Sequence, residues 1–239
     1  MLMAEIQGEL ARLGNAPQAA ILQRFFKTGP GEYGEGDRFR GIRVPVLRKL
    51  ARKFLHLALT EAGDLLRSAC HEDRLLALFI LMDQYYQGGD DVKSTIHHLY
   101  LEHRRFVNSW DLVDASAPHL VGHYLRGRDK STLTRLAVSP VLWERRIAIL
   151  ATFVFIKEGN FDETLRIALL LLGDSEDLIR KAVGWMLREV GKRDLTVAET
   201  FLRAYYRKMP RTMLRYAIER FPETKRQAYL KGTLADVSS

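Results

Sequence analysis

The stretch Ile179-Arg-Lys-Ala-Val-Gly-Trp-Met-Leu-Arg-Glu-Val-Gly191 decides the fold class, because its apolar residues recur at three- and four-residue spacing. This spacing places them on one face of a helix that ends near Gly191. Residues 75–82, 147–154 and 165–172 show the same periodicity, and Gly-Asp follows the last of these stretches. No Asn-Gly or Asp-Gly hairpin turn and no alternating strand pattern accompanies them. The sequence therefore predicts an all-α protein.

These predicted helices recur at a nearly constant separation. Arg74 and Arg146 are 72 residues apart, which is twice 36, and Lys181 and Arg215 follow after 35 and 34 residues. Trp110 occupies the slot 36 residues before Arg146. HEAT and armadillo repeats have periods of about 40–47 residues, so we expect an α-solenoid of HEAT-like helical repeats whose equivalent helices line a concave basic groove. A helical bundle that produces such spacings by chance is the alternative.

The domain organisation is expected to be simple, because no Ser/Gly-rich linker divides the chain. We expect a single domain over residues 1–239, with N-terminal helices and a glycine-rich loop in 1–60, repeats in 61–232 and a tail in 233–239. The segment 27–41 contains too many glycines for a helix, and it lacks the Gly-Lys-Ser/Thr ending of a phosphate-binding loop. Pro45 behind it suits the first turn of a helix.

The charge balance favours a polyanionic partner. The 239 residues include 37 Lys and Arg against 29 Asp and Glu, a net charge of +8. Nucleic acid is therefore expected ahead of an anionic membrane surface. Basic residues behind the glycine-rich segment and in the predicted helices are candidate phosphate contacts, and the alternative is that they are solvated. These candidates are Arg43, Arg48, Lys49, Lys181, Arg188, Lys192, Arg193 and Arg215.

Several other classes of protein are disfavoured. A single cysteine, Cys70, excludes an intramolecular disulfide and fits a reducing cytosol. His119 and His123 have the spacing of helical metal ligands, but no HExxH pattern is present, so no metal is expected. Early acidic residues argue against a signal peptide. The apolar stretch at 167–172 is far shorter than the roughly 20 residues of a membrane span. We expect a cytoplasmic protein without a membrane partner.

Four residues share positions in the repeat register and suggest chemistry. Trp110 and Arg146 occupy one slot, and one helical turn later Asp114 and Trp185 occupy the next. In a solenoid they would face the same way from neighbouring helices. A carboxylate between aromatic rings supports positive charge, and arginine binds phosphate, so the set suits hydrolysis at the glycosidic carbon of a nucleotide. Alternatively, the tryptophans belong to the core and the charged residues form pairs.

Three ordered motifs resemble the AlkD-like DNA alkylation repair family. They are Val107-Asn-Ser-Trp-Asp-Leu-Val-Asp-Ala-Ser-Ala-Pro118, Leu142-Trp-Glu-Arg-Arg-Ile-Ala-Ile-Leu150 and Lys181-Ala-Val-Gly-Trp-Met-Leu-Arg-Glu189, and the resemblance extends over residues 41–216. It implies a right-handed stack of HEAT-like repeats whose basic concave face holds double-stranded DNA. It also implies a monofunctional DNA glycosylase that removes N3- and N7-alkylated purines without a metal or organic cofactor.

The resemblance also implies individual roles. Asp114 would stabilise the oxocarbenium-like sugar and orient the attacking water. Trp110 and Trp185 would pack against the deoxyribose of the lesion, while Arg146 would hold the phosphate backbone. A cationic alkylpurine leaves without a general acid, so this sparse site would suffice. The glycine-rich segment 29–36 departs from the pattern of the best-understood members of the family, which leaves the range of lesions open.

Two other functions remain open on the sequence alone. One is a non-catalytic HEAT-repeat module that binds distorted or branched DNA, and the other is a protein–protein scaffold. Salt-sensitive binding separates both DNA functions from the scaffold, and an Asp114→Asn variant separates an enzyme from a binding module. We expect a monomer, because no long exposed apolar stripe requires a dimer.

Overall fold

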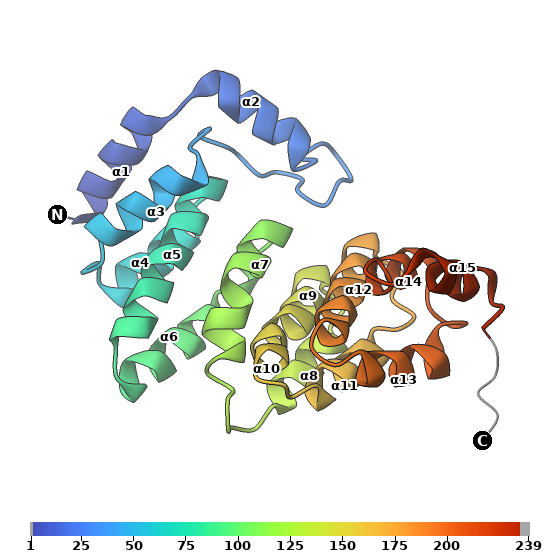
Figure 1. Ribbon diagram of the computed structural model, residues 1–239. Helices are drawn as coiled ribbons and strands as arrows, with labels where there is room; N and C mark the ends of the chain where they lie inside the picture. Colours follow the sequence, from blue (N-terminus) through green and yellow to red (C-terminus); the bar gives the residue numbers. More distant parts are fainter. Residues whose placement is uncertain (1, 235–239) are drawn as a thin grey trace. The chain divides into compact units, whose positions relative to one another are not determined.

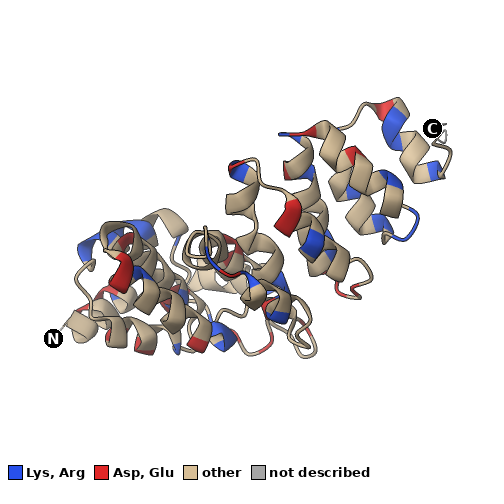
Figure 2. Ribbon diagram, turned by 90° about the horizontal axis from the view of Figure 1, so that it is seen from below, with Lys and Arg blue, Asp and Glu red and all other residues tan. Residues whose placement is uncertain are grey.

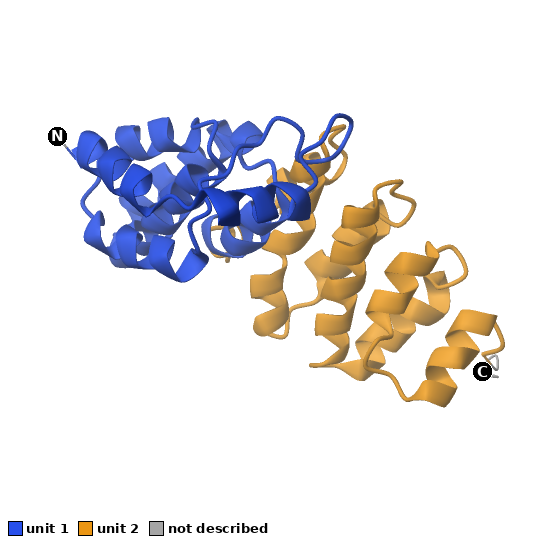
Figure 3. Cartoon of the chain, turned by 90° about the horizontal axis from the view of Figure 1, so that it is seen from above, with its two compact units in different colours: residues 1–120 blue, residues 121–239 orange. Residues whose placement is uncertain are grey.

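The computed structural model describes residues 2–234, and the regular elements in that range are helices (Figure 1). The only β-type pairing among them is an isolated bridge between Arg38 and Cys70. The all-α prediction is therefore confirmed. Most of the predicted C-terminal tail, from residue 235 onwards, lies outside the described residues. The chain divides into two compact units, residues 1–120 (unit 1) and 121–239 (unit 2) (Figure 3). The expectation that residues 1–239 form one domain stays a prediction.

Unit 1 is built around the long helix α5, which is apolar on almost every side. Its residues 75–82 are all buried, so it is a core helix with no solvated stripe along that stretch. Helices α3, α4, α6 and α7 pack against it. The helices of unit 1 are α1 (Leu2–Leu13), α2 (Ala16–Phe25), α3 (Val44–Lys53), α4 (Leu59–Leu66), α5 (His71–Gln87), α6 (Asp90–Glu102), the 3₁₀ turn η1 (Arg104–Phe106) and α7 (Trp110–Ala117). A π-helical stretch, η2 (Pro118–Gly122), follows α7.

Helix α2 is held differently from the other helices of this unit. The side chain of its N-cap, Asn15, accepts a hydrogen bond from the backbone N–H of Gln18 at 2.9 Å, which stabilises the first turn. None of its residues is buried, however, and Ile21 and Phe25 are 61% and 62% exposed. Helix α2 is therefore fixed mainly at its ends.

The glycine-rich segment 27–41 contains no helix, as predicted. It ends at Gly41, whose φ of 78° lies in the left-handed region that glycine adopts most easily. A Cβ atom at this position would lie 2.1 Å from the carbonyl oxygen of Asn15, so the backbone can pass the start of α2 only without a side chain. Helix α3 begins directly afterwards with Pro45 in its first turn, which confirms that prediction.

Unit 2 is built around α12, the helix predicted from residues 179–191. Helices α9, α10, α11, α13 and α14 pack against α12. The helices of unit 2 are α8 (Ser131–Ala137), α9 (Leu142–Ala151), α10 (Phe153–Lys157), α11 (Asp162–Leu170), α12 (Asp177–Gly191), α13 (Leu195–Tyr205), α14 (Arg211–Ala217) and α15 (Glu223–Lys231). Arg146, Lys181 and Arg215 are each the fifth residue of their helices, so the predicted register recurs within this unit.

One predicted helix is interrupted. Residues 147–154 have a continuous helical pattern, but α9 ends at Ala151 and α10 begins at Phe153. The hydroxyl of Thr152 donates a hydrogen bond to the carbonyl oxygen of Ile149 at 2.7 Å. Local bonds of this kind compete with the helical ladder, which accounts for the break.

A glycine allows α12 and α14 to approach closely. A Cβ atom at Gly184 would lie 2.5 Å from both the carbonyl oxygen of Met213 and the Cβ of Tyr216. The glycine that precedes Trp185 is therefore required for the close packing of α12 against α14.

None of the described helices combines the length and apolar character needed to cross a bilayer.

Candidate functional site

Helix α7 carries the first pair of predicted site residues. Trp110 is the first residue of α7 and Asp114 lies one turn later, and both side chains are half-buried. Residues four apart occupy the same face of a helix. The aromatic residue and the acidic residue predicted from the sequence thus lie on the same face of α7 in unit 1.

The ring of Trp110 is stacked on an aromatic side chain from the end of α2. Its centroid lies 5.5 Å from that of Phe26, with the two ring planes only 18° apart. Phe25 contacts the indole edge-on at 6.1 Å. Phe26 is buried, whereas Phe25 is largely exposed. The indole of Trp110 is therefore oriented by packing against the N-terminal segment.

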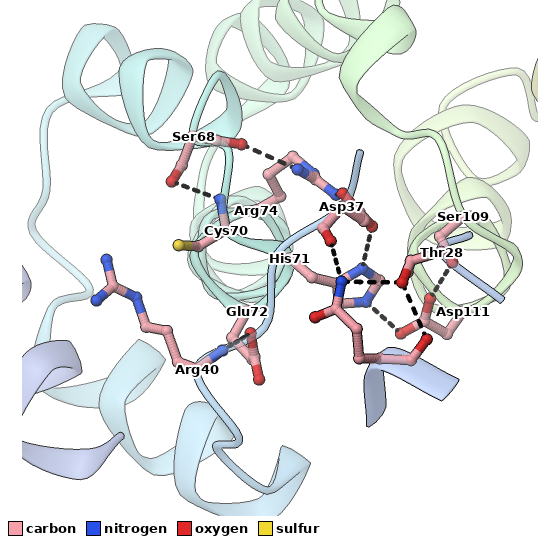
Figure 4. A network of polar contacts seen from close by, with 11 residues as sticks. Thr28, Asp37, Arg40, Ser68, Cys70, His71, Glu72, Arg74, Ser109 and Asp111 are labelled. Carbon is pink, nitrogen blue, oxygen red and sulfur yellow. Dashed lines mark hydrogen bonds and ion pairs between the residues drawn. The ribbon is translucent and has the colours of Figure 1, made fainter. Parts of the chain in front are cut away.

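A buried histidine at the start of α5 lies between two carboxylates (Figure 4). His71 Nδ1 is 2.9 Å from Asp37 Oδ2, and its Nε2 is 2.8 Å from Asp111 Oδ2. Both nitrogens donate only when the imidazole carries two protons. Burial lowers the pKa of His71, but the hydrogen bonds to Asp111 and Asp37 outweigh it and raise the pKa to about 9. His71 is therefore an imidazolium at neutral pH.

The two carboxylates come from different segments. Asp37 belongs to the glycine-rich segment and also forms a buried ion pair with Arg74. Burial alone raises the pKa of Asp37, but the hydrogen bond from His71 and the charge of Arg74 make the net shift downward. Asp111 belongs to the first turn of α7, and its other oxygen accepts a hydrogen bond from the hydroxyl of Ser109 at 2.8 Å.

The first residues of α5 also hold the end of the glycine-rich segment. Glu72 Oε1 accepts hydrogen bonds from the backbone N–H groups of Gly41 (2.7 Å) and Ile42 (3.2 Å), and its Oε2 accepts one from that of Arg40 (2.8 Å). The guanidinium of Arg40 pairs in turn with Asp73 at 2.6 Å. The four ionisable residues that open α5, 71–74, therefore fix the segment that leads from α2 to α3.

A cavity of about 300 Å³ adjoins this ionic cluster. Most of its wall is apolar, and Phe26 and Phe39 supply aromatic surface. His71, Glu72 and Asp111 also line it. The side chains of His71, Glu72 and Asp111 already have partners within the protein, as described above.

The second pair of predicted residues lies in unit 2, on the neighbouring helices α9 and α12. Arg146 is only 5% exposed, and its Nη1 donates to the carbonyl oxygen of Leu178 at 2.6 Å. Trp185 is half-buried, and its ring lies 6.1 Å from that of Phe153. Arg146 therefore connects α9 to the start of α12. This structural role was not expected from the sequence, which predicted a contact with the phosphate backbone.

The indole nitrogen of Trp185 is held by a carboxylate on its own helix. Trp185 Nε1 donates to Glu189 Oε1 at 3.2 Å, and Glu189 also pairs with Lys192 and Arg193. Burial raises the pKa of Glu189, but the hydrogen bonds and charges of these donors, led by Lys192, lower it overall. Trp185 thus donates to an ionised acceptor one turn further along α12.

Lysines and arginines occur on both units (Figure 2), and the eight predicted phosphate contacts differ in their surroundings. Five of them have partners within the protein: Lys181 with Asp177, Arg188 with Glu219, Lys192 and Arg193 with Glu189, and Arg48 over the ring of Phe79 at 4.1 Å. Arg43, Lys49 and Arg215 are exposed, and within residues 2–234 they form no ion pair. These three are the most available for an external anion.

The sequence did not reveal the ionic cluster around His71. One signal was present, because four consecutive ionisable residues, 71–74, come directly before the apolar run 75–82 of the same predicted helix. The expectation that no metal is bound was based on two other histidines, His119 and His123. His119 Nδ1 is hydrogen-bonded to the hydroxyl of Tyr86 at 2.6 Å, and within the described part of the chain no group of three or more His, Cys, Asp or Glu could hold a metal ion. Burial raises the pKa of the Cys70 thiol, which makes it a weak nucleophile.

Comparisons with known proteins find a family and a solved structure that are similar to this chain. The family model for the DNA alkylation repair enzyme matches residues 6–221. A solved structure of a predicted DNA alkylation repair enzyme from Enterococcus faecalis has the same fold, with a TM-score of 0.68 at 17% sequence identity. The match covers 88% of this chain and 97% of that one. A search of curated proteins gives no match.

Proposed function

The chain belongs to the DNA alkylation repair enzyme family, and on this premise we propose that it is a monofunctional DNA glycosylase. Its substrates would be cationic N3- and N7-alkylated purines in double-stranded DNA. One observation carries the proposal: Asp114 follows Trp110 by one turn and shares its face of α7. The reaction hydrolyses the N-glycosidic bond and leaves an abasic site.

The charge of the lesion makes this simple site sufficient. When the bond between C1′ and the purine nitrogen breaks, its electron pair moves to the base and neutralises the positive charge there. Positive charge develops on the sugar, where the Asp114 carboxylate stabilises it. A water molecule then adds to C1′ and loses a proton. The aromatic face of Trp110 supports the same positive charge.

The pair in unit 2 has a supporting role in this proposal. Trp185 packs against the deoxyribose, and its bond to Glu189 fixes the orientation of its ring. Arg146 is the residue to which the family resemblance assigns a backbone phosphate, and its bond to Leu178 fixes its position, although only 5% of it is exposed. An Arg146→Ala variant is therefore expected to lose both stability and DNA affinity.

Non-specific affinity would come from exposed cations in both units. Arg43, Lys49 and Arg215 are the best candidates, because no ion-pair partner among the described residues competes for them. Replacing each by alanine should weaken DNA binding at all sequences alike. It should also reduce the slope of log affinity against log salt by about 0.9 for each phosphate that is no longer bound. An unchanged slope removes that residue from the interface.

The decisive experiment measures base release from a duplex oligonucleotide that carries one N7-methylguanine. Wild type is compared with Asp114→Asn and with Asp91→Asn, which removes an exposed carboxylate of α6 in the same unit. Release by wild type and Asp91→Asn only, with DNA binding intact in all three, supports the proposal. We expect the loss in Asp114→Asn to be about 100-fold or more.

The other outcomes identify the alternatives. If Asp114→Asn releases the base as fast as wild type, the catalytic assignment is wrong. If wild type releases no base but binds DNA in a salt-sensitive way, the protein is a recognition module for distorted DNA. Absence of DNA binding points to a protein–protein scaffold.

A further inference from the structure

The buried histidine at the start of α5 connects two segments that are far apart in sequence. Its nitrogens reach Asp37 in the glycine-rich segment and Asp111 in the first turn of α7, 34 and 40 residues away. Asp111 directly follows Trp110 in the chain. A change at His71 therefore affects Asp111, which is the neighbour of Trp110 in the chain.

Ring contacts form a second connection between His71 and Trp110. Phe39 stacks on the imidazole of His71, with centroids 4.7 Å apart and planes 22° apart. Phe26 lies 4.9 Å from the same imidazole and stacks on Trp110. The position of Trp110 thus depends on His71 through a hydrogen-bonded neighbour and through a stacked ring.

The first turn of α7 needs this support because its cap is incomplete. The N-cap residue, Ser109, makes no side-chain bond to the helix backbone, and its hydroxyl donates to Asp111 instead. A carboxylate in the first turn suits the positive end of the helix dipole. His71 binds the other oxygen of Asp111 and so ties this end of α7 to α5.

We propose that His71 is a positioning residue for base release, because it fixes the first turn of α7 and thereby the orientation of Trp110 and Asp114. The inference rests on the proposed glycosylase function. In this role His71 touches neither the DNA nor the reacting atoms.

The charged neighbours of the imidazole keep it protonated at neutral pH. Asp37 faces it from the glycine-rich segment and Asp111 from α7. Of the charged residues on its own helix, Glu72 is engaged by backbone N–H groups and Arg74 by Asp37. Arg43, at the start of α3, lines the adjoining cavity. A neutral replacement for the histidine loses at least one of the two bonds to carboxylates.

The cavity beside the imidazole makes a chemical rescue experiment possible. In a His71→Ala variant the space left by the side chain joins the cavity of about 300 Å³, which has room for free imidazole. The matched control is His97→Ala. His97 is also buried in unit 1, but its Nδ1 is bonded to the carbonyl oxygen of Leu120 and it does not line this cavity.

The first readout is the single-turnover rate of base release, measured beside the dissociation constant for duplex DNA. We expect His71→Ala to lower the rate by about 100-fold, because a small misplacement of catalytic groups has effects of that size. DNA affinity should change little, and excess imidazole should restore much of the rate in His71→Ala only. A rate near that of wild type, or a lower rate that imidazole does not raise, overturns the proposal.

The second readout does not depend on turnover. The indole N–H resonance of Trp110, assigned with a Trp110→Phe variant, is followed by NMR. It should shift in His71→Ala and return when imidazole is added, whereas His97→Ala should leave it in place. If wild type releases no base, the glycosylase proposal fails, but this resonance still decides whether His71 positions α7. If His71→Ala does not fold, His71→Gln, which can keep one of the two bonds, replaces it without added imidazole, and a rate and an indole resonance equal to those of wild type would then overturn the proposal.

Discussion

The two tryptophans that are proposed to contact the lesion are held in different ways. Trp110, in unit 1, depends on groups distant in sequence: a stacked phenylalanine from the end of α2, and an ionic cluster that joins α5, α7 and the glycine-rich segment. Trp185, in unit 2, is held within the repeating helices: Glu189 on its own helix accepts its N–H one turn away, and Phe153 of α10 lies 6.1 Å from its ring. Repeating helices place both residues, but only the first is fixed by a segment outside the repeat pattern.

This difference shows that the position of a residue in the repeating helices and the packing around its side chain are determined by separate parts of the sequence. The register in α9, α12 and α14 determines which helix face a residue occupies. The N-terminal segment determines how firmly Trp110 is oriented. Unit 1 should therefore respond to changes in buried charge, and unit 2 to changes in helix packing. Four predictions test this contrast.

The largest effect should follow from removing the buried guanidinium in unit 1. Arg74→Met leaves the carboxylate of Asp37 buried without its arginine partner, which should lower the free energy of unfolding by about 3–5 kcal/mol. The control, Lys181→Met, breaks an exposed pair with Asp177 in unit 2 and should cost less than about 1 kcal/mol. Urea unfolding measures both values. If the two substitutions lower the free energy of unfolding equally, buried charge is no more important in unit 1 than in unit 2.

Alkaline pH should weaken unit 1 selectively. His71 has a pKa of about 9 in the folded protein against 6.5 for a free histidine. Its stabilisation, about 3 kcal/mol, is therefore complete below pH 6.5 and is lost as the pH rises through 9. This stabilisation is measured as the difference between the free energies of unfolding at the two ends of this pH range. In His71→Gln this loss between the two pH values should be absent, and its persistence there would assign it to another group.

A methyl group at the contact between α12 and α14 should disturb unit 2. Gly184→Ala places a Cβ against the backbone of Met213 and the side chain of Tyr216, and overpacking of this kind costs about 1–3 kcal/mol. Gly173→Ala is the matched control, because a Cβ there meets no atom within 4 Å. Thermal unfolding compares the two variants. A melting temperature for Gly184→Ala equal to that of the control would show that α14 can move away at no cost.

The smallest effect is expected at Trp185. Glu189→Gln keeps an acceptor for the indole N–H but removes the charge that pairs with Lys192 and Arg193, so the cost should be about 1 kcal/mol or less. Base release should stay within about threefold of wild type, since the orientation of the ring is retained. A loss as large as that expected for His71→Ala would show that the two tryptophans are held equally tightly.

The helices of this protein were predictable from its sequence because their apolar spacing is regular. Residues 179–191 identify α12 correctly, and the segment 27–41 is correctly left without a helix. The break at Thr152 was missed, since it depends on a single hydroxyl bond inside a continuous apolar pattern. Local periodicity contains no information about such a bond.

The candidate site was only partly predictable. Trp110 and Asp114 share a face of α7 because four residues span about one helical turn. The burial of Arg146 was missed, because the same register position is exposed at Arg215 and depends on the neighbouring helix. The pairing of His71 with Asp37 and Asp111 joins residues 34 and 40 positions apart, and no spacing rule connects them.

Helix α2, which buries none of its residues, also determines where this protein tolerates change. Substitutions at Ile21 and Phe25 remove little buried surface, so they leave the stability of the fold almost untouched. Phe25 nevertheless contacts the ring of Trp110. A directed-evolution library aimed at new DNA lesions should therefore begin on this helix, where variation next to the proposed site carries the lowest risk of unfolding.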